Sequence, residues 1–119
     1  QFLYEPDGAV IRARLIGDLG RLIGGRMLDR TIAYLTTDEP AETPFAQGFR
    51  IVADFALDQR SLKRELASRG IGTVEIKKRG VDIDPAAFRT ALSPKGENSA
   101  TLFLTRVGGK RRALLAERL

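Results

Sequence analysis

The chain has 119 residues, of which 43% are hydrophobic and 29% are charged, a composition typical of one globular domain rather than a disordered chain. It contains no Cys and no His, which excludes a structural zinc site and a His-based catalytic triad. Its apolar runs are too short to span a membrane, and its start shows no signal-peptide pattern. We therefore expect a cytoplasmic protein, with which the absence of Cys is compatible.

Positive charge is concentrated in the second part of the chain. Residues 1–49 hold five Lys or Arg and seven Asp or Glu, a net charge of −2, whereas residues 50–119 hold fifteen and eight, a net charge of +7. A basic half beside a mildly acidic half suggests one face for a polyanion and another for a protein neighbour. The alternative, which a charge run taken alone favours, is that these cations only keep the domain soluble.

Residues 1–25 predict a strand followed by one helix. The apolar residues 2–4 form the short strand, and Asp7 can cap a helix from Gly8 to about Leu22. The pair Gly24-Gly25 ends this helix. Its apolar side chains recur at spacings of three and four residues and form one stripe, made of Val10, Ile11, Leu15, Leu19, Leu22 and Ile23.

Two strands follow, separated by an acidic loop. β-Branched and aromatic residues predict a strand over 31–36, and a mostly apolar run predicts another over 49–57. The stretch 37–44 between them carries two Pro and three acidic residues and predicts a surface loop. Its carboxylates could also bind a cation, but nothing in the spacing fixes their geometry.

Two capped helices lie on either side of the next strand. Asp58 predicts the start of a helix over 59–69, and Asp84 followed by a proline predicts a second over 85–92. Alternating apolar and polar residues predict the intervening strand over 73–79. The residues expected to face the core from the two helices are Leu62, Leu66, Phe88 and Leu92.

Residues 99–119 predict a β-hairpin, because two strand-like runs flank Gly108-Gly109. A like-charge pair at its tip is unfavourable unless solvent or an anion separates the two cations. Solvation of the tip and contact with phosphate are equally open explanations. The expected cross-strand pairs are Leu102 with Leu115, Leu104 with Ala113, Arg106 with Arg111 and Val107 with Lys110, with Lys110 and Arg112 on the opposite face from the arginine pair.

These elements predict an α+β fold built on a single mixed sheet. The second half has the order β-α-β-α-β-β and follows an N-terminal helix. Crossovers of this length predict parallel neighbouring strands with right-handed connections, and the hairpin adds an antiparallel strand.

A basic cluster marks the end of the strand over 73–79, only a few residues before the helix that starts after Asp84. A strand end, consecutive cations and a helix N-terminus in so short a stretch predict a phosphate site. Joined with the cations of the hairpin, the predicted phosphate contacts are Lys77, Lys78, Arg79, Arg106, Lys110, Arg111 and Arg112.

The sequence contains no motif of an enzyme complete in itself. It lacks the glycine motifs of dinucleotide and nucleotide binding and the nucleophile elbow of hydrolases. Asp82 and Asp84 could form a carboxylate pair, but a turn and a helix cap explain them better. Phe103 could stack on a base, yet its expected partner Leu114 indicates a core residue. We expect no catalytic residue, no metal site and no cofactor site in this chain.

Four segments together resemble a known family: Y-E-P-D-G-A-V-I-R-A (4–13), I-A-Y-L-T-T-D (32–38), K-K-R-G-V-D-I-D-P (77–85) and L-T-R-V-G-G-K-R-R-A-L-L (104–115). Their order and spacing are similar to those of the THUMP-like domain at the C-terminus of bacterial class I SAM-dependent methyltransferases (SAM, S-adenosylmethionine). The likeness covers nearly the whole chain. It implies one domain over residues 1–119, cut from a longer protein. The start at Gln1 rather than Met agrees with this, although processing could give the same result.

The resemblance also implies that the methyl-transfer domain and its SAM lie upstream, and that this domain binds the substrate. THUMP domains are associated with structured RNA such as tRNA, so the expected partners are tRNA or rRNA and the upstream domain. The alternative is an interaction domain that packs on the methyltransferase core or mediates dimerisation, with a basic face that is only solvated. We further expect residues 2–22 to face the upstream domain.

Overall fold

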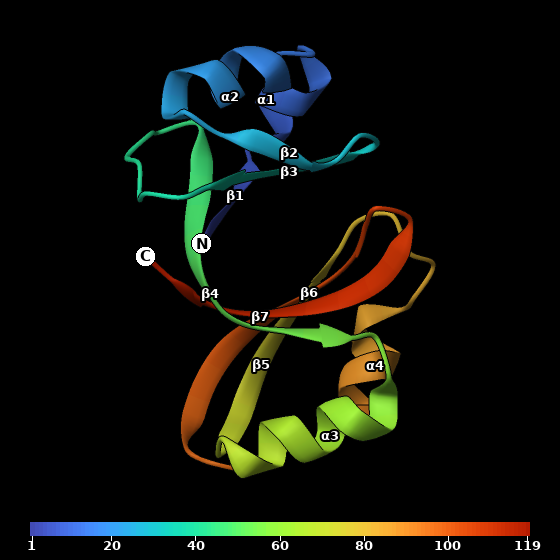
Figure 1. Cartoon of the computed structure of the whole chain (residues 1–119). Helices are drawn as coiled ribbons and strands as arrows, with labels where there is room; N and C mark the ends of the chain where they lie inside the picture. Colours follow the sequence, from blue (N-terminus) through green and yellow to red (C-terminus); the bar gives the residue numbers. More distant parts are fainter.

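In the computed structural model, which describes residues 1–119, seven strands form one curved mixed sheet in the order β2-β3-β1-β4-β7-β6-β5 (Figure 1). The predicted α+β class is therefore confirmed. The strands are β1 (Phe2–Pro6), β2 (Arg26–Asp29), β3 (Ile32–Thr37), β4 (Ala46–Ala56), β5 (Ile71–Lys78), β6 (Asn98–Val107) and β7 (Lys110–Arg118), and the helices are α1 (Gly8–Arg12), α2 (Ile16–Ile23), α3 (Gln59–Ser68) and α4 (Pro85–Leu92).

Two pairs of helices cover two ends of the sheet (Figure 1). Helices α1 and α2 lie over β1, β2 and β3, and helices α3 and α4 lie over β5, β6 and β7. We call these regions the N-terminal lobe and the C-terminal lobe. Between them the concave face of the sheet holds a core of its own, consisting of Leu3, Ile32, Tyr34, Phe49, Phe103, Leu114 and Ala116.

The long strand β4 joins the lobes and carries a bulge at Val52. Its pairing with β7 shifts from Ile51 opposite Ala116 to Ala53 opposite Leu115. Before the bulge, Ile51 packs against the concave core, whereas after it Ala53 packs against the core under α3 and α4. An extra residue in one strand reverses the side-chain alternation and bends the strand. This bend brings the two lobes toward each other.

The predicted single helix over residues 8–22 is wrong in one respect, because it is broken into α1 and α2. Arg14 between them has a left-handed backbone with φ 60°. The Leu15 N–H reaches back to the Val10 carbonyl at 3.0 Å and closes the turn. Two short helices let both Val10 and Leu19 pack inward on the sheet. The Gly24 end of the helix is confirmed, with φ 70°.

The predicted crossovers are half right. Strands β5 and β6 are parallel neighbours joined by α4, as expected. Strand β4 is not adjacent to β5, because β7 and β6 lie between them. Strand β7, the second strand of the hairpin, pairs with β4. It thus occupies the position beside β4 that a simple crossover would give to β5. Strand β2 was not predicted, since its four residues are partly exposed and lack strong alternation.

The local signals of the second half are confirmed. Asp58 accepts a hydrogen bond from the Ser61 N–H at 3.0 Å, and Asp84 accepts one from the Ala86 N–H at 3.2 Å. The hairpin turns at Gly108-Gly109. All four predicted pairs, Leu102 with Leu115, Leu104 with Ala113, Arg106 with Arg111 and Val107 with Lys110, occur in the structure.

Candidate nucleic-acid interface

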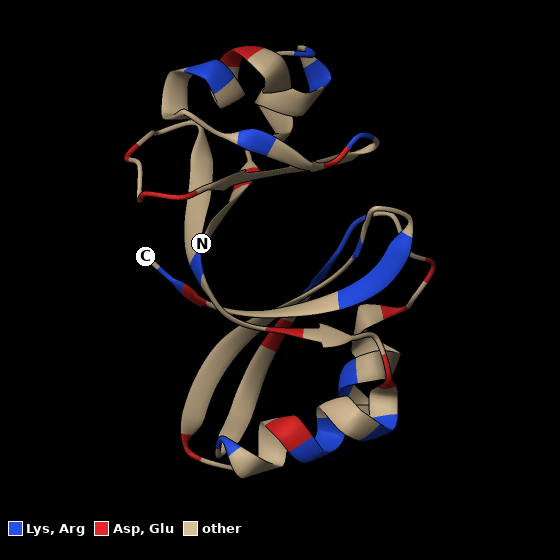
Figure 2. Ribbon diagram, in the orientation of Figure 1, with Lys and Arg blue, Asp and Glu red and all other residues tan.

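The two predicted basic clusters lie at the same end of the sheet. Because β5 and β6 are parallel neighbours, their C-terminal ends meet there, with Lys78 opposite Leu104. The Arg79 N–H donates to the Leu104 carbonyl at 3.1 Å, so the cluster continues beside β6. Strand β6 continues from Leu104 to Val107, and the hairpin turns at Gly108, four residues after Leu104. Figure 2 shows blue segments gathered at this end of the sheet.

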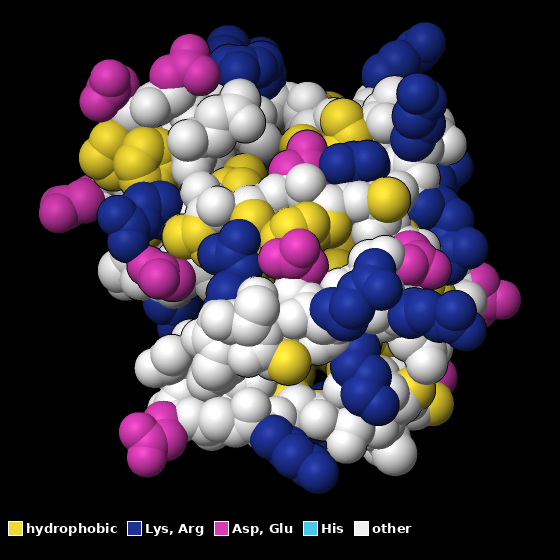
Figure 3. All heavy atoms as spheres, turned by 60° about the horizontal axis from the view of Figure 1, so that its bottom comes forward, with side chains coloured by type: hydrophobic (Ala, Val, Ile, Leu, Met, Phe, Trp, Pro, Cys, Tyr) yellow, Lys and Arg dark blue, Asp and Glu magenta, His cyan; other side chains and the backbone are white.

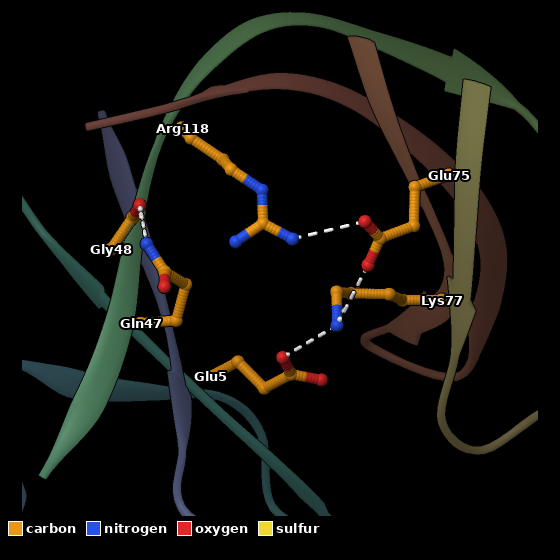
Figure 4. A network of polar contacts seen from close by, with 6 residues as sticks. All are labelled: Glu5, Gln47, Gly48, Glu75, Lys77 and Arg118. Atoms are coloured by element: carbon orange, nitrogen blue, oxygen red, sulfur yellow. Dashed lines mark hydrogen bonds and ion pairs between the residues drawn. The ribbon is translucent and has the colours of Figure 1, made fainter. Parts of the chain in front are cut away.

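Lys77 is engaged within the protein (Figure 4). Its Nζ lies 2.9 Å from Glu5 Oε1 and 3.2 Å from Glu75 Oε1, and its side chain is only 22% exposed. Burial disfavours the charged ammonium, but the hydrogen bonds to Glu5 and Glu75 outweigh it and raise the pKa of Lys77. Glu75 also accepts from Arg118 Nη2 at 2.9 Å. The structure therefore places Lys77 in a network that joins β1, β5 and β7.

Two further predicted contacts are partly occupied. Arg112 Nε donates to Asp54 Oδ1 at 2.9 Å, across the β4–β7 pair. The Arg79 guanidinium lies 5.5 Å from the centre of the Tyr34 ring, a cation–π arrangement. Burial of Tyr34, followed by the Glu5 carboxylate, raises the pKa of its hydroxyl, and Arg79 only partly opposes this. None of the ion pairs includes Arg79, so its guanidinium has no carboxylate partner.

The other four predicted cations form no salt bridge, although the charge of Arg106 helps to lower the pKa of Asp29. Lys78, Lys110 and Arg111 are exposed, and Arg106 is half-buried. Arg106 stands opposite Arg111 in the hairpin, and its Nε is buried without a hydrogen-bond partner. We call Lys78, Arg79, Arg106, Lys110 and Arg111 the basic tip. In Figure 3, Lys and Arg side chains gather along the right-hand side of the molecule, the side on which Figure 1 places this end of the hairpin.

A groove lies between the basic tip and the β2–β3 turn of the other lobe. It encloses about 630 Å³, and the Gly109 N–H approaches Asp29 Oδ2 across it at 3.5 Å. Hydrogen bonds from the Thr31 backbone, and then from Gly109, lower the pKa of Asp29 against the effect of burial. Arg30 lines the groove and was missed by the sequence reasoning, which assigned no element to the β2–β3 turn. The lining residues are Met27, Leu28, Asp29, Arg30, Thr31, Arg106, Gly108 and Gly109.

No three acidic side chains come together in a way that could hold a metal ion. Asp84 acts as a helix cap, as predicted. Phe103 is fully buried, with its ring edge-on to Tyr34 at 5.2 Å and to Phe49 at 4.9 Å, so it offers no surface for stacking. No helix is long and apolar enough to cross a membrane.

Three comparisons with known proteins agree on one kinship. The family model described as THUMP domain-like matches residues 46–118, which hold β4 to β7 and thus the whole basic tip. Two proteins of Mycobacterium tuberculosis, from strains CDC 1551 / Oshkosh and ATCC 25618 / H37Rv, are each 38% identical to this chain over 108 residues. Both are described as uncharacterized S-adenosylmethionine-dependent methyltransferases. The matched region is 91% of this chain and 30% of each of theirs.

A solved structure of a candidate methyltransferase from Porphyromonas gingivalis W83 has the same fold. It superposes with a TM-score of 0.80 at 20% identity, over 99% of this chain and 29% of that one. The present chain thus spans less than a third of the length of each of these proteins.

Proposed function

Because the chain belongs to the THUMP domain-like family, we propose that it is the RNA-binding, substrate-recognition domain of a longer SAM-dependent methyltransferase. Its ligand is structured RNA, tRNA or rRNA. SAM binds in the remaining, catalytic part of that protein, since this chain has no glycine-rich nucleotide loop.

The observation that carries the proposal is the basic tip. Five cations without carboxylate partners, from β5 and both arms of the hairpin, lie at one end of the sheet. Arg106 and Arg111 face each other across the hairpin, which is unfavourable unless an anion comes between them. A phosphodiester backbone supplies such an anion, and Lys and Arg contacts to it give affinity and register.

The groove supports an RNA ligand rather than an isolated phosphate. Arg30 from the N-terminal lobe and Arg106 from the hairpin line its two sides, so both lobes present cations to the same space. When a single strand of RNA, or the edge of an RNA helix, enters this groove, the cations on its two sides contact successive phosphates of the RNA. The domain then holds the RNA and leaves the chemistry to the catalytic part.

The geometry divides the seven predicted contacts into two groups. Lys77 and Arg112 already bind carboxylates, so their main role is structural. The five residues of the basic tip are the primary contacts of the proposal, and Arg30 joins them.

The test is the binding of labelled tRNA to the 119-residue chain, measured by fluorescence anisotropy over a series of salt concentrations. We expect the double variant Lys78→Glu/Arg111→Glu to lose at least tenfold in affinity and to show a salt slope smaller by about two phosphate contacts. The matched control is Lys63→Glu/Arg64→Glu on α3, which makes the same charge change at exposed residues that do not line the groove. Equal losses in both variants would show a diffuse charge effect and refute the proposed interface.

A further inference from the structure

A second surface, on the outer side of the N-terminal lobe, is apolar. Three large side chains project into solvent there: Leu22 is 66% exposed, Phe45 49% and Leu15 46%. Together with the more buried Val10 and Leu19 they line a hollow of about 260 Å³. We call this surface the α1–α2 face.

The α1–α2 face is more than a set of scattered apolar residues. Its members come from the junction of α1 and α2, from α2 itself and from the loop before β4, and they converge on one hollow. The broken helix turns Val10 and Leu19 toward the sheet and leaves Leu15 and Leu22 outside. Exposed apolar side chains that gather around one hollow are typical of a surface that contacts another protein, whereas scattered ones need no explanation.

The charge of this face distinguishes it from the basic tip. Its lining includes one charged residue, Asp18, which is already paired with Arg21. Without a free cation it offers nothing to RNA phosphates, whereas an apolar protein surface would bury it favourably. Strands β2 and β3 lie between α1–α2 and the hairpin tip in Figure 1, so the two surfaces can be occupied at the same time.

We infer that the α1–α2 face packs against the catalytic part of the longer methyltransferase chain, an inference that rests on the proposed function. In the mycobacterial relatives about two thirds of the chain lies outside the region similar to this one, as it does in the solved Porphyromonas protein. Those parts must be joined to a domain of this fold. The α1–α2 face gathers three of the six large hydrophobic side chains that are exposed in this chain, and its use for that contact leaves the basic tip open to RNA.

Hydrogen exchange on the full-length protein and on the 119-residue chain tests this inference. We expect the amides of residues 19–23 to exchange at least tenfold more slowly in the full-length protein, because the covering surface suppresses local opening of α2. The variant Leu22→Lys should abolish this difference in the full-length protein while leaving exchange in the 119-residue chain unchanged. The control Leu119→Lys replaces an apolar side chain of 58% exposure outside the face and should change neither.

Three results would overturn the inference. The first is equal exchange at residues 19–23 in both proteins while the full-length protein binds SAM, which leaves the proposed function intact. The second is a dimer of the 119-residue chain in sedimentation velocity that Leu22→Lys dissociates, because a second copy would then be the occupant. The third is a full-length protein that does not bind SAM, which removes the proposed function along with the inference.

Discussion

The ammonium of Lys77 on β5 lies 2.9 Å from the carboxylate of Glu5 on β1, although β4, β7 and β6 separate these two strands in the sheet. Such a contact is possible only because the sheet curls until its two halves face each other (Figure 4). The bulge at Val52 provides the bend, and the pair then holds the two lobes together. Lys77 is thus a structural residue first, despite its place in a run of three cations.

A double-mutant cycle with Glu5→Gln and Lys77→Met should reveal this link between the lobes. Both side chains are only 22% exposed, so the pair is better shielded from water than an ordinary surface ion pair. We expect a coupling energy of about 1 kcal/mol from chemical denaturation at neutral pH and low salt. The same cycle on the exposed pair Arg26 and Asp38 should give about 0.3 kcal/mol or less. A coupling no larger for Glu5–Lys77 than for that surface pair would contradict the structural role.

The Glu75 carboxylate should make the stability of the domain sensitive to acid. Hydrogen bonds from Arg118 and then Lys77 lower the pKa of Glu75 below its ordinary value of 4.5. A carboxyl with a lowered pKa in the folded state stabilises the protein above about pH 4.5, and this contribution is lost as the pH falls through the folded-state pKa. The variant Glu75→Gln should therefore be less stable than the parent at pH 7, and the two should converge as the pH falls below the lowered folded-state pKa of Glu75. Denaturation midpoints measured from pH 3 to 7 check this. A constant difference over that range would show that Glu75 does not titrate as described.

Local signals made the helices α3 and α4 and the hairpin predictable. Asp58, Asp84 and Gly108-Gly109 each act through neighbours in the sequence, and each does in the structure what its residue type favours. The break at Arg14 was not predictable from periodicity, because an apolar stripe with spacings of three and four fits one helix as well as two. Strand order was also beyond the sequence, because the placement of β7 between β4 and β6 depends on pairing between distant residues.

The candidate site was predictable in composition but not in detail. The cations of β5 and the hairpin could be identified from their positions, and a parallel β5–β6 pair brings them to one end of the sheet. The sequence could not show that Glu5 lies beside Lys77, because that contact depends on the curvature of the whole sheet. Arg30 was missed because β2 was missed, and only the folded chain brings the β2–β3 turn opposite Arg106.

Gly72 on β5 should tolerate no side chain. A Cβ added there would lie 2.0 Å from the Gly96 carbonyl oxygen. Because this clash is with backbone, either β5 or the segment around Gly96 would have to move. We expect Gly72→Ala to lower the free energy of unfolding by about 2 kcal/mol or more. Gly17 in α2 is the matched control, since an added Cβ would meet only the end of the Arg21 side chain at 3.7 Å. Gly17→Ala should stabilise the helix by about 0.5 to 1 kcal/mol. Thermal denaturation of both variants measures the contrast, and a neutral Gly72→Ala would show that β5 and the loop before β6 are less closely packed than described.

Reversing the charge of Arg111 at the hairpin tip should stabilise the free domain and weaken its binding to RNA. Arg106 and Arg111 are a directly opposed like-charge pair, so Arg111→Glu replaces repulsion by attraction and should stabilise the free domain by about 0.2 to 1 kcal/mol. The same substitution removes a proposed phosphate contact and introduces a carboxylate, so tRNA affinity should fall by at least fivefold at moderate salt.

The control is Arg50→Glu on β4. Arg50 lies opposite Glu117, so this substitution turns an attractive cross-strand pair into a repulsive one. That variant should lose stability by a similar amount and retain most of its RNA affinity, because Arg50 lies outside the basic tip. Denaturation midpoints and tRNA anisotropy titrations on the two variants give all four quantities. If Arg111→Glu destabilised the domain, the opposed pair would not be strained in the free protein, and if it bound tRNA as tightly as the parent, the hairpin would not contact RNA.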